Sequence, residues 1–352
     1  MKNYSSLLID RNRTILDALK QLDEISPIAL TLFVIDDDYR VLGSITDGDV
    51  RRTLVRGSKL DDSIISVYNK NFYFLYENDK NLYLEISGLK KKGIKLIPVL
   101  SKNGQIVEII DIRAKKSILP LDVVLMAGGR GERLRPLTDT VPKPLLKIGD
   151  KPIIEHNIDR LIEYGISNFF ITENYLAEQL VEYFGNGSAK GINIHHILEP
   201  EKMGTFGSVS LIDGFVNDYV LVMNSDLFTN INYEDLFLHF MENDADLSAV
   251  AVSHTISIPY GIFDLEGHSI RGIQEKPILN YYANAGIYLF KKNFMDIIPK
   301  NTFFDATDFI SALIDKECKV IRFPLTGYWI DIGKHEEYNK AQELIRHTKN
   351  EN

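Results

Sequence analysis

Apolar residues in the second part of the chain gather in short uninterrupted runs that alternate with segments of helical periodicity. The runs 123–126 and 219–223 are typical of buried strands. Between them, Ile154, Ile158 and Leu161 share one face of a helix that we expect to end at Gly165. Strands alternating with helices favour an α/β fold with a mostly parallel sheet. Further elements are expected in this order: strand 169–172, helix 177–184 and strand 192–198.

The first part of the chain carries a weak internal repeat. Residues 32–45 align without gaps on residues 97–110, an offset of about 65 residues. Each copy reads as a β-hairpin, with an apolar strand, a polar turn and a second apolar strand. A helical stretch precedes each hairpin, and in the first copy Thr14 and Asp17 suit a helix start. We therefore expect two domains, residues 1–118 and residues 119–352, with a short linker between them.

This repeat resembles a tandem pair of CBS motifs, βαββα units that associate around an adenine-nucleotide cleft. The resemblance is carried by the segment 43–52, in which Thr46 and Asp49 match the family's phosphate and ribose contacts. The second copy lacks the corresponding Gly, Thr and second Asp, so one cleft at most is expected to hold AMP or ATP. The pair could equally serve as a scaffold or a dimer-forming module without a ligand. Because CBS pairs commonly pack together, the resemblance also implies a homo-oligomer.

Composition narrows the functional class. The chain has 352 residues, 45% of them hydrophobic, which is enough for real cores in about two domains. A net charge of −9 argues against a partner as large and anionic as a nucleic acid. One cysteine, Cys318, excludes an internal disulfide framework and fits a reducing compartment. We expect a cytoplasmic protein with no membrane span, because no apolar run approaches the ~20 residues that a span needs.

The strongest candidate for chemistry is the glycine-rich turn that follows the strand 123–126. Glycines let backbone N–H groups approach an anion closely, and Arg133 and Lys143 would add a cationic clamp for a triphosphate. The lysine spacing is wrong for a Walker loop. The string Gly-Gly-x-Gly-x-Arg-Leu-x-Pro-Leu-Thr at residues 128–138, followed by Pro-Lys-Pro at 142–144, resembles the signature of the sugar-1-phosphate nucleotidyltransferases. This resemblance implies a nucleotidyltransferase fold with a Rossmann-like, mostly parallel mixed sheet, preceded here by the CBS pair. The nucleotide-binding positions that match within the turn are Ala127, Gly128, Gly129 and Gly131.

Further segments match the same family in the expected order. Asp226 and Asp331 match its metal-ligand positions, and carboxylates facing a triphosphate are hard oxygen ligands that suit Mg²⁺. In the family, the lysine at the position of Lys276 holds the phosphate of the sugar phosphate. Three more positions match sugar contacts of the family: Gly261, Glu275 and Asn284.

A loop ahead of the strand 219–223 resembles the family's base-reading loop and includes Gly204 and Thr205. Relatives that use pyrimidine nucleotides carry a glutamine where this chain has Glu199. A carboxylate offers only acceptors, which suits the adjacent N1–H and N2–H donors of guanine. The pattern therefore favours GTP, although Glu201 could be the reader instead.

The resemblance implies an enzyme that joins a nucleoside triphosphate to a sugar 1-phosphate and releases pyrophosphate, with Arg133, Lys143 and Lys276 as catalytic cations. The domain order is similar to that of the guanylyltransferases that activate glucosamine 1-phosphate for bacterial legionaminic acid synthesis. Mannose or heptose 1-phosphate as acceptor, and uridylyl or thymidylyl transfer, remain open. From another class, the domain could be a sensor that binds sugar nucleotide without turnover.

Overall fold

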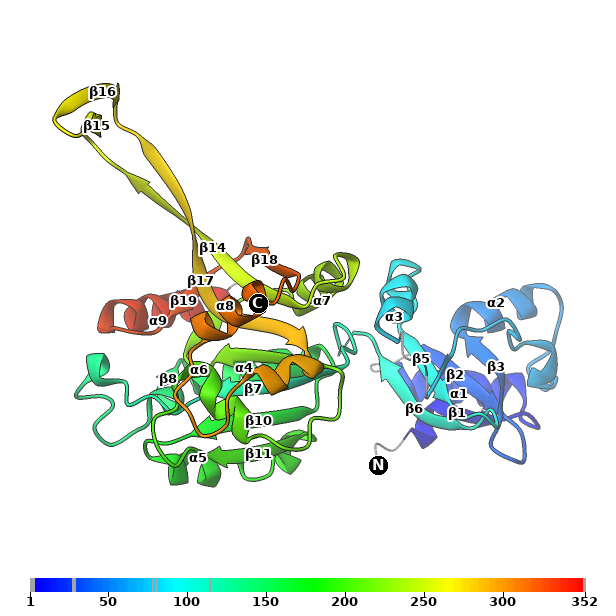
Figure 1. The fold of residues 1–352 in the computed structure, drawn as a ribbon. Coiled ribbons are helices and arrows are strands. Elements are labelled where there is room, and N and C mark those ends of the chain that lie inside the picture. Colours follow the sequence, from blue (N-terminus) through cyan, green and yellow to red (C-terminus); the bar gives the residue numbers. More distant parts are fainter. Residues whose placement is uncertain (1–3, 27–29, 78, 80–81, 114, 351–352) are drawn as a thin grey trace. The chain divides into compact units, whose positions relative to one another are not determined.

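The computed structural model describes residues 4–26, 30–77, 79, 82–113 and 115–350. It divides into two compact units, Met1–Ile118 and Leu119–Asn352 (Figure 1). Within the described part of the chain, no helix is both long enough and apolar enough to cross a membrane.

The described residues of the first unit repeat one topology. Two three-stranded sheets have the orders β1-β2-β3 and β4-β5-β6, each with one parallel and one antiparallel pair. The elements, in chain order, are β1 (Leu8–Asp10), α1 (Ile15–Ile25), β2 (Thr31–Ile35), β3 (Val41–Thr46), α2 (Asp47–Val55), β4 (Leu75–Tyr76), α3 (Leu82–Lys91), β5 (Leu96–Leu100) and β6 (Ile106–Asp111).

Both predicted hairpins are present, and they share an irregularity. The register between β2 and β3 shifts at Val34/Ile35, and the register between β5 and β6 shifts at Val99/Leu100, the equivalent positions of the repeat. Helix α1 begins as predicted, since Thr14 and Asp17 form a reciprocal capping box. The repeat is therefore a property of the backbone as well as of the sequence.

The second unit is built on one mixed sheet. Its described residues form seven strands in the order β11-β10-β7-β12-β17-β14-β18, in which β17 runs antiparallel to its neighbours and the other pairs are parallel. The predicted mostly parallel sheet is thus confirmed. The elements are β7 (Leu121–Met126), β8 (Lys147–Ile148), β9 (Lys151–Pro152), α4 (Ile153–Glu163), β10 (Asn168–Glu173), α5 (Ala177–Phe184), β11 (Asn193–Leu198), α6 (Gly204–Gly207), β12 (Tyr219–Asn224), β13 (Leu227–Thr229), α7 (Tyr233–Glu242), β14 (Leu247–Ser257), β15 (Ile262–Glu266), β16 (Ser269–Gln274), β17 (Ile278–Lys291), α8 (Ala306–Asp315), β18 (Val320–Leu325), β19 (Trp329–Asp331) and α9 (His335–Asn350).

The central strands are buried because their apolar runs face helices on both sides. Val123, Val124 and Leu125 of β7 have no exposed surface, and neither do Leu221 and Val222 of β12. β7 and β12 are parallel neighbours, with Met126 level with Asn224. Their carboxyl ends therefore meet at the same edge of the sheet, which is where open α/β sheets place their ligands.

β14 and β17 continue well beyond the sheet as a two-stranded ribbon with β15 and β16 at its tip (Figure 1). β18 pairs with β14 only as far as Val252, and β12 pairs with β17 only from Ile287 onward. We call residues 253–284 the β-arm. Nothing in the sequence pattern predicted that this segment would leave the body of the unit.

One buried carboxylate ties three segments of this sheet together. Asp122 of β7 is fully buried and accepts hydrogen bonds from the backbone N–H groups of Val216 and Asn217 at 2.6 and 2.8 Å. The side-chain amides of Asn217 and Asn168 donate to its other oxygen at 2.9 and 2.8 Å. Its removal would leave several donors buried without an acceptor.

We expect Asp122→Ala to lower the free energy of unfolding by about 3 kcal/mol, since each orphaned buried donor is costly. Trp329, the only tryptophan of the sequence, lies in the second unit, so its fluorescence in a urea titration reports on this unit. The exposed Asp213→Ala is the matched control and should leave the midpoint unchanged. Equal midpoints for Asp122→Ala and Asp213→Ala would contradict the stabilising role assigned to Asp122.

Candidate active site

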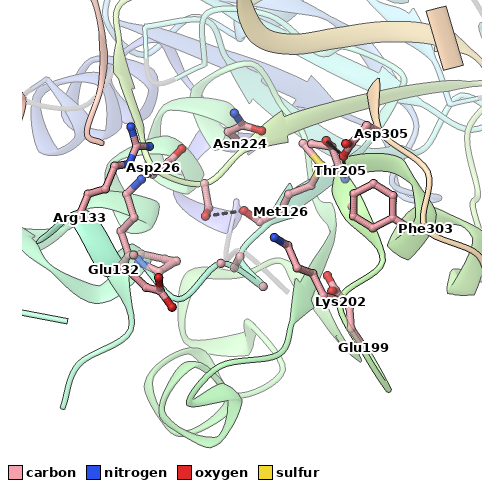
Figure 2. Close-up of a pocket in the computed structure, with 18 residues that line it drawn as sticks. Met126, Glu132, Arg133, Glu199, Lys202, Thr205, Asn224, Asp226, Phe303 and Asp305 are labelled. Atoms are coloured by element: carbon pink, nitrogen blue, oxygen red, sulfur yellow. Dashed lines mark hydrogen bonds and ion pairs between the residues drawn. The ribbon is translucent and has the colours of Figure 1, made fainter. Parts of the chain in front are cut away.

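A cavity of about 530 Å³ opens at the carboxyl ends of β7 and β12 (Figure 2). Its floor is the glycine-rich turn, and charged side chains from four segments surround it. The predicted residues that line it are Ala127, Gly128, Gly129, Gly131, Arg133, Lys143, Glu199, Gly204, Thr205 and Asp226. The structure therefore brings together every predicted nucleotide-binding position and two of the three predicted catalytic cations.

The turn after β12 is held in place by hydrogen bonds to two neighbouring elements. The Ser225 hydroxyl donates to the Met126 carbonyl at 2.6 Å, which joins the ends of β12 and β7. From α4, the buried Asn157 donates to the carbonyls of Ser225 and Leu227 at 3.3 and 2.8 Å. Asp226 is thus fixed from both sides.

Asp226 and Lys143 form a buried ion pair, with side-chain exposures of 19% and 11%. The second carboxylate oxygen of Asp226, Oδ1, is buried and has no hydrogen-bond partner in the described part of the chain. A buried carboxylate oxygen without a partner destabilises the folded protein unless a cation or a hydrogen-bond donor contacts it.

Asp331 lies beside Asp226 because β19 pairs with β13, placing Asp331 level with Leu227. Burial raises the pKa of the Asp331 carboxyl, and the negative charge of Asp226 raises it further, while Lys143 and Arg133 act in the opposite direction. Two carboxylates kept this close favour a cation between them.

These donors fit Mg²⁺, which takes hard oxygen ligands and needs few from the protein. The free Oδ1 of Asp226 and the neighbouring Asp331 are two such ligands, and a triphosphate would supply others. Among the described residues, no cluster of three or more His, Cys, Asp or Glu is suited to hold a metal ion.

Glu199 closes the side of the cavity next to the glycine-rich turn. Its side chain is buried, and burial raises the pKa of its carboxyl even though the Met203 backbone and the hydroxyls of Thr172 and Ser208 beside it lower that pKa. Gly128 makes this placement possible, because a Cβ there would lie 2.7 Å from Glu199 Oε1. Glu201, the alternative reader, is exposed and does not line the cavity.

Two charged residues of this site, Lys202 and Asp305, were not among the predicted site residues. Lys202 lines the cavity near Glu199 (Figure 2), and Asp305 accepts hydrogen bonds from the backbone N–H and hydroxyl of Thr205, both at 3.0 Å. Lys202 looked like an ordinary surface lysine in a polar loop. Asp305 is about 100 positions from its partner, so only the tertiary structure could show the contact.

Five predicted positions do not line this cavity: Asp331, which lies beside Asp226, and four positions on β14–β17. Gly261, Glu275 and Lys276 are exposed residues of the β-arm, and Asn284 lies at its base, where its amide donates to the Tyr288 hydroxyl at 2.7 Å. Glu275 is adjacent to Gly261, since a Cβ on Gly261 would lie 3.0 Å from Glu275 Oε2. Gly261 and Glu275 thus lie together near the tip of the β-arm, whereas Asn284 lies at its base, and the structure does not bring the first two to the nucleotide-binding positions.

Comparison with known proteins agrees with this geometry. The model of the family described as Nucleotidyl transferase matches residues 122–348. The chain belongs to the nucleotidyl transferase family. It is 30% identical over 234 residues to a mannose-1-phosphate guanylyltransferase of Mycobacterium tuberculosis, covering 64% of this chain and 65% of that protein. It is 33% identical over 232 residues to the bifunctional protein GlmU of Methanocaldococcus jannaschii, covering 64% and 54%.

The chain thus spans 54% to 65% of the length of these curated relatives. Among solved structures, a putative glucose-1-phosphate thymidylyltransferase from Bacillus anthracis matches with a TM-score of 0.53 and 24% identity, over 64% of this chain and 95% of that one. HddC from Yersinia pseudotuberculosis matches with a TM-score of 0.50 and 25% identity, over 64% and 99%. These likenesses agree with the α/β fold described above.

Replacing Gly128 tests the packing of Glu199 against the turn. We expect Gly128→Ala to lower the free energy of unfolding by about 1–3 kcal/mol, because the new methyl group displaces a packed side chain. In the background of Glu199→Ala, the same change should cost much less, since the clashing carboxylate is gone.

The matched control is Gly129→Ala, whose added Cβ would meet nothing within 4 Å. Urea titrations followed by Trp329 fluorescence give the free energies of unfolding of all four variants: Gly128→Ala, Glu199→Ala, their combination and Gly129→Ala. Equal costs of Gly128→Ala in both backgrounds would show that Glu199 does not occupy the space above Gly128.

Proposed function

We propose that this protein is a sugar-1-phosphate guanylyltransferase, which joins GTP to a sugar 1-phosphate and releases pyrophosphate. The observation that carries the proposal is Glu199, a buried carboxylate in the wall of the cavity beside the glycine-rich turn. Names of relatives add support, since several are mannose-1-phosphate guanylyltransferases.

The reaction needs no protein nucleophile. An ionised phosphate oxygen of the sugar 1-phosphate attacks the α-phosphorus of GTP, a new P–O bond forms, and the bond to the bridging oxygen breaks with release of pyrophosphate. The chain contributes positioning and charge. Arg133 would stabilise the charge on the phosphates and Lys143 would hold the departing pyrophosphate, while Lys276 would place the acceptor phosphate.

Mg²⁺ held by Asp226 and Asp331 would supply charge stabilisation at the α-phosphate. Lys143 and Asp226 form an ion pair, in which their charges neutralise each other. Binding of the triphosphate would give Lys143 a new anionic partner and leave Asp226 with both carboxylate oxygens for the metal.

Glu199 would accept from the N1–H and N2–H groups of guanine. The backbone of Met203 and the hydroxyls of Thr172 and Ser208 lie beside this carboxylate. The Ser208 hydroxyl donates to Thr172 Oγ1 at 3.3 Å, so the carboxylate keeps acceptor capacity for the base. Uracil or thymine would instead set the O4 oxygen against a carboxylate.

Two acceptors are supported by different observations. The domain order favours glucosamine 1-phosphate, as in the legionaminic acid pathway, while the names of relatives favour mannose 1-phosphate. No residue of the cavity separates an amine from a hydroxyl at the second carbon of the sugar.

The decisive assay is pyrophosphate release in Mg²⁺, with five nucleoside triphosphates crossed against glucosamine, N-acetylglucosamine, glucose, mannose and heptose 1-phosphates. We expect release with GTP. Glu199→Gln should lower kcat/KM for GTP on the order of 10²-fold and improve UTP or dTTP relative to GTP, because an amide both donates and accepts. Glu201→Gln is the matched control and should behave as wild type.

Release by wild type with UTP or dTTP instead would refute the base assignment and keep the reaction class. No release with any pair would favour a sensor that binds sugar nucleotide without turnover.

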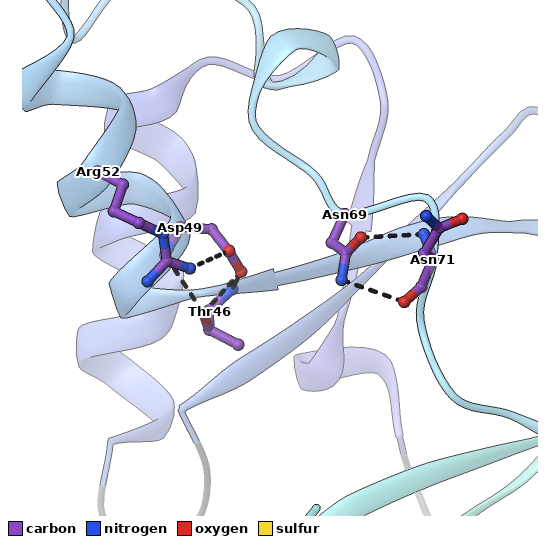
Figure 3. Close-up of polar contacts among 5 residues, drawn as sticks. All are labelled: Thr46, Asp49, Arg52, Asn69 and Asn71. Carbon is purple, nitrogen blue, oxygen red and sulfur yellow. Dashed lines mark hydrogen bonds and ion pairs between the residues drawn. The ribbon is translucent and has the colours of Figure 1, made fainter.

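A second proposed function concerns the first unit. A cavity of about 500 Å³ is lined by Thr46 and Asp49 of the first repeat and by Gly93 to Leu96 of the second. We propose that it is a CBS-type site for an adenine nucleotide. Asp49 already accepts from the backbone and hydroxyl of Thr46, at 2.9 and 2.6 Å, and from Arg52 at 2.5 Å (Figure 3). Ribose hydroxyls would have to displace Arg52, whose side chain is exposed.

Titration calorimetry of AMP into the full-length protein tests this site. AMP is the better first ligand, because ATP is also a triphosphate that the other cavity could hold. We expect saturable heat that is lost in Asp49→Ala and kept in the exposed Asp61→Ala. Absence of heat in the wild type would leave the repeat as a scaffold, with Thr46 and Asp49 serving only as a helix cap.

A further inference from the structure

The β-arm cannot deliver its tip to the cavity of its own chain. Its base is beside that cavity, since a Cβ on Gly286 of β17 would lie 2.6 Å from the amide of Asn224, a cavity residue. The strand from Ile278 to Gly286 covers eight steps, and at about 3.3 Å per residue it spans roughly 26 Å. Lys276 lies two residues farther out.

Bending at the base does not shorten this distance. Pairing between β14 and β17 is regular from Ala251↔Asn284 to Ser257↔Ile278, and the register shift lies inward of it, between Ala249 and Ala251. A regular ribbon that pivots beside the cavity keeps its tip roughly 26 Å from the pivot at every angle. The base is also held by Arg322 of β18, whose guanidinium lies 4.0 Å from the Tyr282 ring centroid.

The β-arm is also poorly stabilised by its own chain. A lone two-stranded ribbon is marginally stable in water, and both of its edges carry unpaired backbone groups that favour pairing with another chain. Large apolar side chains along it are 54% to 73% exposed: Tyr260, Phe263, Leu265, Ile270, Ile273 and Ile278.

The size of this surface matches that of a protein interface. The β-arm comprises about 30 residues, and a stable interface uses about 20–30 residues on each side. A second copy of the same chain offers an equivalent arm and an equivalent incomplete cavity. In a two-fold dimer each arm can contact the partner and each cavity can receive the partner's arm, because every contact occurs twice.

We propose that two copies of this chain exchange their β-arms, so that Lys276 and Glu275 of one copy complete the cavity of the other. This inference rests on the proposed function for the role of Lys276, whereas the interface itself does not. Each active site would then consist of the nucleotide-binding body of one copy and the acceptor-binding tip of its partner. Lys276 is suited to this role, because the described residues offer it no hydrogen-bond or ion-pair partner within its own chain.

Subunit complementation is the test. Lys276→Ala and Asp226→Asn are each expected to reduce pyrophosphate release at least 100-fold as homodimers. A heterodimer of the two, made by co-expression with different tags and two-step purification, contains one site with both native residues and one with neither. We expect it to recover about half of the wild-type rate.

The matched control is a heterodimer of Lys143→Ala and Asp226→Asn, two lesions in the body, which should recover nothing. Failure of the Lys276→Ala and Asp226→Asn pair to recover activity would overturn the proposal and place Lys276 in the site of its own chain. Full activity of Lys276→Ala alone would also overturn it.

Sedimentation gives a readout that does not depend on activity. We expect the wild type to sediment as a dimer or larger assembly, and Phe263→Asp to reduce that assembly. An unchanged assembly in Phe263→Asp, or a monomeric wild type, would overturn the exchange. A wild type that assembles through the arm but releases no pyrophosphate with any substrate pair would count against the proposed function alone.

Discussion

Two neighbouring carboxylates, Asp226 in the lining of the cavity and Asp331 beside it, are the constraint around which the second unit is organised. Pairing of β19 with β13 fixes Asp331 beside Asp226, and the pKa of Asp331 is raised by burial and by that neighbour. Such a pair is unfavourable without compensating positive charge. Lys143 supplies it by direct contact with Asp226, and Arg133 supplies it at longer range to Asp331.

The rest of the cavity can be understood as the scaffold that maintains this arrangement. Asn157 and Ser225 fix the backbone around Asp226, while Asp122, at the other end of β7, ties that strand to its neighbours. These hydrogen bonds thus offset the unfavourable free energy of holding the two carboxylates close together. A triphosphate with its metal would relieve the same unfavourable pairing of the two carboxylates.

The β-arm, unlike the body of the second unit, has few stabilising contacts within its own chain. Its apolar side chains are exposed and its edges are open, whereas the sheet from which it extends is fully buried at its centre. The body therefore gains its stability alone, whereas in the proposed exchange the arm would gain it from a second copy. Exchange of arms would couple assembly to activity, because a separate copy would carry the nucleotide-binding residues without the cation for the acceptor phosphate.

Local patterns in the sequence determined much of this protein. Apolar runs and helical periodicity predicted α5 at residues 177–184 and the strands around it, since burial of an apolar face is decided over a few neighbouring residues. The glycine-rich turn and its resemblance predicted the lining of the cavity from Ala127 to Asp226. The repeat predicted both hairpins of the first unit, and the family match confirmed the resemblance of the second unit.

Only the tertiary structure decided what depends on contacts between distant segments. Lys202 and Asp305 join the cavity through loops whose composition is ordinary, and the support of Asp226 by Asn157 links positions that are about 70 residues apart. The largest difference concerns Gly261, Glu275 and Lys276, which the sequence associated with the nucleotide-binding residues. Motif order along a chain carries no information on whether a ribbon folds over its own body or extends away from it. That choice depends on how far the pairing of β14 and β17 continues past the sheet, and the sequence motif does not record that length.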